Sequence, residues 1–243
     1  MRSAAQPSTM DQGSAAVTTL DVIAALRDRR SIRGFRPDAV DRATVESVLA
    51  DAARSPSAGN TQPWRVHVCA GKVRDRLSLE LLAAHAAGGA GHTEEYLYYP
   101  SEWRNPYLAR RRQVGKDLYS LLGIPKGDTD QMARQYARNY EFFGAPVGLF
   151  FTLDRHLDGQ AAWLDLGMYL HGVMLAALGH GLATCAQQAF ARYHRIIRAH
   201  LGIPDAEIVV CGMSLGHPDG NEPANQLMTL REPVSSFARF TGV

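Results

Sequence analysis

The stretch VGLFFTLD, residues 147–154, is a short and almost entirely apolar run, which is typical of a buried strand. The longest helical pattern of the chain follows it, over about 160–178, and a second apolar run, EIVVCGMSLG, covers residues 207–216. A further strand is expected in WRVHVCA, residues 64–70, where apolar and polar residues alternate. Because these strands are few and are separated by helices, the sequence predicts an α+β fold in which helices wrap a small central sheet.

Helical patterns fill much of the remaining chain. The expected helices begin at Thr19 and after the capping residue Asp41, and cover about 72–85, 107–122, 128–143 and 193–201. Residues 1–18 have no apolar periodicity and predict a flexible leader, so residues 19–243 are expected to form one domain. Residues 86–106, rich in glycine, proline and aromatic side chains, interrupt the helical pattern and are expected to be irregular.

The composition is that of a globular protein: 46% of the 243 residues are hydrophobic, and the formal net charge is only +2. This charge gives no general attraction for nucleic acid, and no run reaches the roughly 18 apolar residues expected of a membrane span. The three cysteines, Cys69, Cys185 and Cys211, form no CxxC pair, which predicts free thiols and a cytoplasmic location. The histidines show no metal-binding spacing, so no metal is expected.

Five arginines crowd into RDRRSIRGFRP, residues 27–37. One interpretation is electrostatic, because cations at the C-terminal end of a helix interact favourably with its dipole. The other is a phosphate site, since Arg29, Arg30 and Arg33 are close together and guanidinium groups suit a phosphate. The distant Arg231 is a candidate to complete such a site. The residues alone leave both interpretations open.

Two further stretches contain small residues that allow a ligand to approach the backbone. In SPSAGNTQPW, residues 55–64, the amides around Asn60 suit a planar ligand, although an ordinary helix-to-strand connection remains open. In GLATCAQQAF, residues 181–190, the residues alone favour a solvated turn. The stretch GMSLG, residues 212–216, matches the nucleophile motif GxSxG, but a turn follows it and no histidine follows Asp219, which argues against a hydrolase.

Four motifs in a fixed order, RRSIRGF, SPSAGNTQPW, GLATCAQQ and LR followed by EP, resemble the FMN-dependent nitroreductase family over residues 20–243. The chain also resembles the dehalogenating branch of that family, the iodotyrosine deiodinases. The resemblance implies a mainly antiparallel sheet, an intertwined homodimer with FMN sites at the subunit interface, and NAD(P)H as electron donor. It also implies a ping-pong, two-electron reduction of nitroaromatic or quinone acceptors, with carboxylated, nitrobenzoate-like compounds among the candidates.

The resemblance implies which residues contact the cofactor. Those for the FMN phosphate and ribityl chain are Arg29, Arg30, Ser31 and Arg231, and Arg33 would lie at the pyrimidine edge of the flavin. Those that would reach FMN from the other subunit are Pro56, Ser57, Ala58 and Asn60. Gln187 and Gln188 would pass under the isoalloxazine ring, with the Gln188 backbone N–H facing N5. No side chain is then obligatory for catalysis, because FMN carries the chemistry.

Residues 88–145 correspond to the variable lid of the family. The implied substrate contacts are Gly59, Tyr98, Tyr99 and Trp103. Arg110, Arg111 and Arg112 are candidates to attract a carboxylate, and a solvated helix face is the alternative. Two other functions remain open: a reductive dehalogenase of halogenated phenols or tyrosines, and a flavin-binding protein without general reductase activity.

Overall fold

The computed structural model describes residues 21–157 and 159–242, so the expected leader and the helix start at Thr19 lie outside the described residues. Four strands form one sheet in the order β1-β2-β4-β3, and every neighbouring pair is antiparallel. The strands are β1 (Arg65–Ala70), β2 (Val147–Asp154), β3 (Ala183–Gln187) and β4 (Glu207–Gly216). The predicted α+β fold with a small antiparallel sheet is confirmed.

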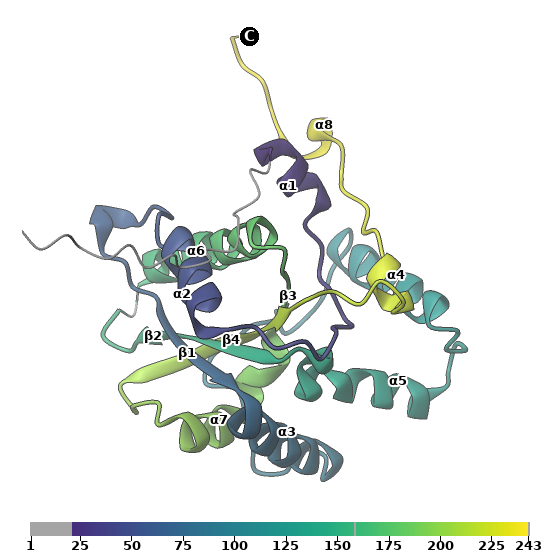
Figure 1. Cartoon of the computed structure of the whole chain (residues 1–243). Coiled ribbons are helices and arrows are strands. Elements are labelled where there is room, and N and C mark those ends of the chain that lie inside the picture. Colours follow the sequence, from purple (N-terminus) through teal and green to yellow (C-terminus); the bar gives the residue numbers. More distant parts are fainter. Residues whose placement is uncertain (1–20, 158, 243) are drawn as a thin grey trace, which may run out of the picture.

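Helices cover both faces of this sheet (Figure 1). One layer contains α2 (Arg42–Ala52) and α6 (Gln160–Gly179), and the other contains α3 (Gly71–Ala86) and α7 (His194–Leu201). Successive side chains of β2 alternate between the layers: Leu149 and Phe151 pack with α2 and α6, whereas Phe150 packs with α3 and α7. Burial on both faces explains why this strand is almost entirely apolar.

The stretch 181–190 is not a solvated turn, and that expectation was wrong. Its first half forms β3, in which Thr184, Cys185 and Gln187 are buried. The strand pairs with residues 212–216 of β4, and its small residues fit between that strand and the helices. A short run of small and polar residues carries no periodicity from which a buried strand can be predicted, because the pairing partner supplies the burial.

The expected helix over 128–143 is divided into two parts. It consists of α5 (Thr129–Ala137) and a 3-10 segment, η2 (Arg138–Gly144). Phe142 and Phe143 adopt positive φ values of 54° and 53°, outside the helical region, and both side chains are buried. The burial of two adjacent aromatic side chains accompanies this departure from helical geometry just before β2.

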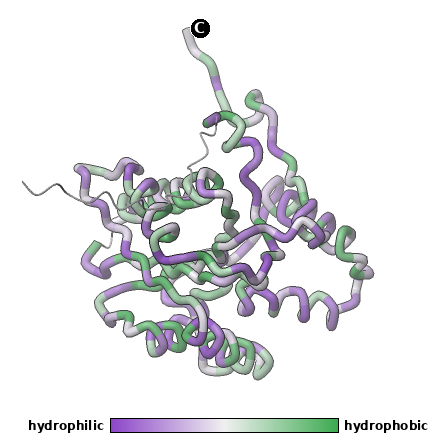
Figure 2. Tube along the Cα trace, viewed as in Figure 1, coloured by the Kyte–Doolittle hydropathy of each residue, from purple (hydrophilic) through white to green (hydrophobic). Residues whose placement is uncertain are grey.

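The remaining helices are α1 (Val22–Asp28), α4 (Tyr107–Leu121), α8 (Val234–Phe237) and the short 3-10 segments η1 (Ala58–Asn60), η3 (Gln188–Tyr193) and η4 (Pro223–Gln226). Of these, η3 belongs to the layer of α3 and α7, since its Phe190 and Tyr193 are buried in that core. Asp21 caps α1, since its carboxylate accepts from the Ile23 N–H at 3.1 Å. Helices α4 and α5 project from the sheet, contain no buried residue, and are more hydrophilic than α6 (Figures 1 and 2).

Among the described helices, only α6 is long and apolar enough to cross a membrane, with 20 residues and a mean hydropathy of 1.4. The expectation that no run reaches this length was therefore too strict. Length and composition do not distinguish a membrane span from a helix that packs in a protein. Here one face of α6 packs on the sheet, while Leu164 and Met168 on the other face are 71% and 40% exposed.

Candidate functional site

The segment 29–36, here called the arginine loop, follows α1 and is held by three different parts of the fold. The Ile32 N–H donates to Thr184 O at 3.0 Å, at the start of β3. The Phe35 N–H donates to Phe143 O in η2, at 3.1 Å. The Arg36 N–H donates to His217 O, just after β4, at 2.9 Å. The path of the loop is therefore fixed by residues that are distant in sequence.

The structure brings Arg231 close to the arginine loop. The pKa of Arg29 lies below its ordinary value, first because the guanidinium is partly buried and second because the positive charge of Arg231 is nearby. No carboxylate of the described residues forms an ion pair with Arg29, Arg30, Arg33 or Arg231. A cluster of like charges without counter-ions is unfavourable unless an anion joins it.

A cavity of about 430 Å³ lies beside this cluster, at the C-terminal end of α6. It is lined by Arg29, Arg30, Leu178 and Met228 among others, and the Arg30 Nη1 lies 3.2 Å from the Met228 Sδ. Burial raises the pKa of the adjacent Cys185 thiol to about 11, against the opposing influence of Arg33, Arg29 and a hydrogen bond with Ser31. The predicted phosphate residues thus converge where the arginine loop meets β3.

The SPSAGNTQPW stretch contains an exposed loop with a constrained backbone. Gly59, Asn60 and Gln62 have positive φ values of 58°, 58° and 48°. The buried Asp165 of α6, 3% exposed, holds the loop by accepting from the Ala58 N–H at 3.1 and 3.2 Å. The Ser57 hydroxyl accepts from the Gln62 N–H at 3.0 Å. Pro56 and Asn60 remain exposed, so the loop presents its tip to the surroundings.

The arginine cavity and this loop lie at opposite ends of α6. The loop is bonded to Asp165, whereas the cavity is lined by Leu178. At ~1.5 Å of rise per residue, these two positions are about 20 Å apart. The view in Figure 1 agrees, since α1 lies above the right-hand end of α6 and the chain that leads into β1 lies at its left-hand end. Within one chain, the structure does not bring the two predicted parts of the FMN site together.

The two glutamines after β3 have different environments. The Gln187 side chain is buried, donates to Asn139 O at 2.7 Å and accepts from the Ser214 Oγ at 2.5 Å. Ser214 is therefore a buried structural residue, in agreement with the argument against a hydrolase. The Gln188 side chain is half-buried near the Tyr96 hydroxyl. Burial raises the pKa of Tyr96, and the opposing influence of Gln188 does not outweigh it. Ala186 is exposed, which leaves the backbone before Gln188 accessible.

Aromatic side chains of residues 96–103 form a connected cluster. Ring centroids of Tyr98 and Tyr99 are 4.6 Å apart, and those of Tyr99 and Trp103 are 5.4 Å apart. Tyr96 joins the cluster to α6, since its ring lies 4.7 Å from that of Trp163. The three predicted lid residues therefore lie together, although Gly59 is in the separate loop at the start of α6.

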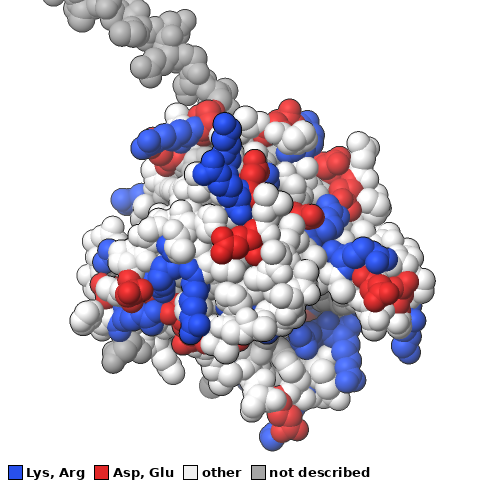
Figure 3. Space-filling view, turned by 90° about the horizontal axis from the view of Figure 1, so that it is seen from below, with Lys and Arg blue, Asp and Glu red and all other residues white. Residues whose placement is uncertain are grey.

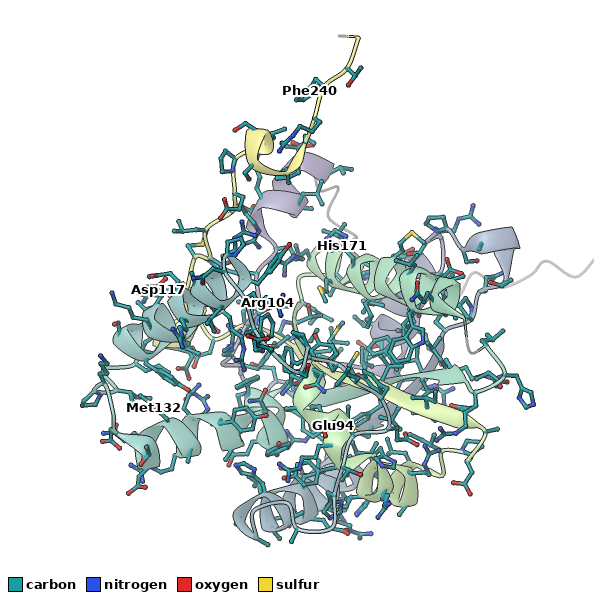
Figure 4. All side chains as sticks on the ribbon, turned by 180° about the vertical axis from the view of Figure 1, so that it is seen from behind. Glu94, Arg104, Asp117, Met132, His171 and Phe240 are labelled. Carbon is teal, nitrogen blue, oxygen red and sulfur yellow. The ribbon has the colours of Figure 1, made fainter. Side chains whose placement is uncertain are left out.

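The structure separates the three adjacent arginines of α4. The Arg111 guanidinium lies over the rings of Tyr99 and Trp103, at 5.2 and 5.1 Å from their centroids. Arg110 pairs with Glu232 at 2.9 Å, and Arg112 lines a different cavity, between α4 and α5. Figure 4 shows the labelled Arg104 near the middle of the molecule and Asp117 and Met132 on its outer arms. Only Arg111 is thus in place to attract an anion to the aromatic cluster.

No group of histidine, cysteine and acidic residues in the described chain could hold a metal ion. On the face of the molecule shown in Figure 3, basic and acidic side chains are interspersed, without a continuous basic surface. All three cysteines are free and buried, as expected. The arginine cavity is therefore the feature of the described chain that best suits an anionic ligand.

A model of the nitroreductase family matches residues 26–217. The chain belongs to the nitroreductase family. It is 39% identical to the nitrobenzene nitroreductase of Ectopseudomonas oleovorans over 88% of this chain and 94% of the relative. It is 38% identical to the 4-nitrobenzoate reductase of Pseudomonas putida over 93% and 98% of the two chains.

A solved structure gives the same result for this nitroreductase-family chain. The crystal structure of the FMN and NADPH-dependent nitroreductase NfnB from Sphigopyxis sp. strain HMH superposes with a TM-score of 0.88 and 37% identity. The similarity covers 92% of this chain and all of the other. The family predicted from four short motifs is confirmed.

Sequence reasoning missed several residues that organise this nitroreductase site. Asp165 had a signal that could have been used, because it is an isolated acid within an apolar helix. The sequence suggested Glu95 only as a lid acid of the dehalogenating branch, and nothing indicated Tyr96. In the structure, Glu95 accepts from the Val209 N–H at 3.3 Å and Tyr96 donates to Val210 O. They cover the edge of β4 that β3 leaves free. Asn225, buried beside the arginine loop, was likewise not predicted.

Proposed function

We propose that this nitroreductase-family protein is an FMN-dependent oxidoreductase that uses NAD(P)H to reduce nitroaromatic compounds. One observation carries the proposal: arginines cluster beside the cavity at the C-terminal end of α6. These arginines form no ion pair with an acidic residue of the described chain. The relatives confirm the predicted reaction class and cofactors, since they reduce nitrobenzene or 4-nitrobenzoate, and the structural relative depends on FMN and NADPH.

The residues present fit a phosphate-bearing cofactor. Arg29 and Arg231 repel one another, and a phosphate dianion between them replaces that repulsion with two charge-assisted interactions. Arg30 borders the same cavity, and Ser31 adds a hydroxyl donor. We therefore assign Arg29, Arg30, Ser31 and Arg231 to the phosphate and ribityl chain.

Bound FMN supplies the two-electron redox chemistry, and the protein orients it. Arg33 would supply a fixed cation at the pyrimidine edge, where it would stabilise negative charge on the reduced cofactor. The Gln188 backbone N–H is assigned to N5, next to the exposed Ala186. The buried Gln187 side chain is already hydrogen-bonded within the protein, so its contribution is to hold β3 against η2.

We further propose a homodimer in which each FMN site combines the arginine loop of one subunit with Pro56, Ser57, Ala58 and Asn60 of the other. Support comes from the separation of about 20 Å between the two regions within one chain. Exposed apolar side chains on the unburied face of α6 and on the C-terminal segment also favour a second copy: Leu164, Met168, Phe237 and Phe240.

The cluster of Tyr98, Tyr99 and Trp103 suits an aromatic acceptor, and the nearby Arg111 suits a carboxylate on it. The dehalogenase alternative would use lid acids to grip an amino acid. Glu95 is not free for that purpose, because it is bonded to Arg155 and to Arg198, the latter at 3.2 Å. This engagement favours the nitroaromatic acceptor.

Three assignments stay predictions: the cytoplasmic location, the single domain over 19–243 and the lid over 88–145. The free and buried thiols support the first. Helices that pack on both faces of one sheet support the assignment of a single domain. The absence of buried residues from α4 and α5 supports the third.

The test of the proposed function is an anaerobic redox cycle of the purified protein. Flavin absorbance near ~450 nm should bleach with NADH or NADPH and return when 4-nitrobenzoate is added. A colourless protein that takes up no added FMN would contradict the cofactor. A flavoprotein that no nicotinamide nucleotide reduces would instead point to flavin binding without general reductase activity.

The dimer proposal has a separate test, which uses two defective subunits. One carries Arg29→Ala and Arg231→Ala, and the other carries Asn60→Ala and Ala58→Asp. Differently tagged subunits are co-expressed and the mixed dimer is purified. A shared site predicts that the mixed dimer recovers one native FMN site of its two, whereas both parental dimers bind FMN weakly. Failure of the mixed dimer to bind FMN better than either parent contradicts the shared site.

A further inference from the structure

Arg33 is held by a residue far away in the sequence. The Arg33 N–H donates to the Asn225 Oδ1 at 2.6 Å. The Asn225 Nδ2 donates to Gly34 O at 2.8 Å and to Asp219 O at 2.8 Å. One side chain therefore bonds the two peptide units that flank the Arg33–Gly34 peptide, one before Arg33 and one after Gly34. In Figure 1 the segment after α1 and the segment that contains η4 lie side by side, as these bonds require.

Asn225 is built into this position. Its side chain is buried, with 7% of the residue exposed, and its amide oxygen and both amide hydrogens are used. The surrounding turn packs tightly, because a Cβ at Gly34 would overlap the Glu222 side chain. Glu222 in turn pairs with Arg138 at 3.0 Å. A buried amide with complete hydrogen bonding fixes the local backbone in one orientation.

The orientation of this peptide decides where the Arg33 guanidinium goes. Its Nη1 donates to Ser31 O at 3.3 Å, and its charge opposes the rise in the Cys185 pKa that burial causes, so the group lies toward the start of β3. The only acceptor is thus a backbone carbonyl, and no side chain of the described residues accepts a hydrogen bond from this guanidinium. Its position therefore depends on the backbone of the arginine loop, which Asn225 holds together with the Ile32–Thr184 and Asp219–Gly34 backbone hydrogen bonds.

We infer that Asn225 is the positioning residue for Arg33, and that through Arg33 it sets the midpoint potential of the bound flavin. A cation held at the pyrimidine edge stabilises the negative charge that reduction places there, and displacing it lowers the potential. The inference rests on the proposed function, because it requires Arg33 to face the flavin. Asn225 itself touches neither cofactor nor substrate; it acts through the loop.

The test is a double-mutant cycle on the FMN-loaded protein, with Asn225→Ala, Arg33→Met and their combination. The midpoint potential is measured by anaerobic titration against reference dyes, and the FMN Kd by fluorescence quenching. We expect Asn225→Ala to lower the potential toward that of Arg33→Met and to raise Kd about threefold. In the Arg33→Met background the same change should leave the potential unmoved.

Asn221→Ala is the matched control, since this exposed asparagine lies in the same turn and its side chain makes no hydrogen bond among the described residues. A potential that Asn225→Ala leaves at the wild-type value overturns the inference. The inference is also overturned if Asn225→Ala lowers the potential by the same amount in the wild-type and Arg33→Met backgrounds, because the effect would then not pass through Arg33. A lowered Tm alone, with an unchanged potential, indicates a merely structural role and also overturns it.

A second variant covers the case in which Asn225→Ala does not fold. Asn225→Asp keeps the side-chain size and the acceptor for the Arg33 N–H, but it loses both donors and adds a charge. A direct effect of that charge on the flavin persists in the Arg33→Met background, whereas an effect through Arg33 disappears there. If Arg33→Met alone leaves the potential unchanged, the failure lies in the proposed contact of Arg33 with the flavin, and the two failures are distinguished.

Discussion

The two ends of α6 carry the two halves of the candidate site, and they are supported in different ways. At the C-terminal end, the arginine loop is bonded to β3, to η2 and to the segment after β4. At the N-terminal end, the exposed loop around Asn60 is held chiefly by the carboxylate of Asp165. The first region concentrates positive charge beside a cavity, and the second presents a constrained backbone outward.

The comparison shows that a single chain holds each half of the candidate site in place but keeps the two halves apart. The helix between the halves is a rigid spacer of about 20 Å, so no side-chain movement can close the gap. The exposed apolar face of the same helix offers the surface on which a second chain can bring the halves together. The predictions that follow test each half and the helix between them.

The largest effect is expected from the arginine end. The double variant Arg29→Ala/Arg231→Ala should raise the FMN Kd by at least about 100-fold, because two charge-assisted contacts to a phosphate are lost. Fluorescence titration of the apoprotein measures it. Arg27→Ala, in the same run of arginines but exposed on α1, should bind FMN as the wild type does. If the wild type, the double variant and Arg27→Ala bind FMN with equal affinity, the FMN phosphate does not bind at this end of α6.

The next effect concerns the helix itself. Leu164→Glu places a charge on the exposed apolar face of α6 and should weaken a dimer about 100-fold, since an unpaired charge would become buried. Sedimentation velocity measures the oligomeric state. Leu79→Glu is the matched control: this leucine is 69% exposed on the outer helix α3. A Leu164→Glu dimer as tight as the control would show that α6 does not face a second copy.

A smaller effect is expected at the other end of the helix. Asp165→Asn removes the charge that accepts the Ala58 N–H and should raise the FMN Kd about tenfold by loosening the loop around Asn60. The variant Asp130→Asn serves as the control, because Asp130 is exposed on α5 and its side chain makes no hydrogen bond among the described residues. If Asp165→Asn lowers the Tm but leaves the FMN Kd unchanged, the loop takes no part in the cofactor site.

Changes at the aromatic cluster should alter the binding of the electron acceptor and not the binding of FMN. Arg111→Met is expected to raise the KM for 4-nitrobenzoate about fivefold while leaving the KM for nitrobenzene nearly unchanged, because nitrobenzene has no carboxylate to pair with the guanidinium. Steady-state kinetics with both acceptors measure the difference. Arg112→Met, on the other side of α4, is the control. A similar change for both acceptors would mean that Arg111 does not recognise the carboxylate.

The smallest effect is a pH dependence at the anchor of the lid. Burial raises the pKa of Glu95, but hydrogen bonds from Arg155 and Val209 and the charges of His194 and Arg155 outweigh it, so the pKa is lowered. A lowered carboxyl pKa gives stability that is present above the unfolded value and is lost as the pH falls through the folded one. Glu95→Gln should therefore lower the Tm at pH 7 and have less effect at pH 3. Its exposed neighbour Glu94 gives the control variant Glu94→Gln, and a pH-independent difference would contradict the linkage.

The sequence predicted those features whose cause is local. The buried strand 147–154 and the helix 160–178 follow from apolar pattern and length, and both are present in the structure. The arginine loop was recognisable because charge of one sign is concentrated in a few residues. By contrast, β3 was expected to be a turn, since five small or polar residues have no pattern of their own and are buried only through pairing with β4.

By itself, the sequence determined the α+β class, the family and the residues that gather charge, because each depends on residue types at fixed spacing along the chain. Only the tertiary structure decided that Arg231 lies beside Arg29, that Asn225 bonds the backbone on both sides of the Arg33–Gly34 peptide, and that Asn60 lies at the far end of α6. These contacts join segments that are distant along the chain. Their geometry is set by how the layers pack on the sheet, and no local pattern records that packing.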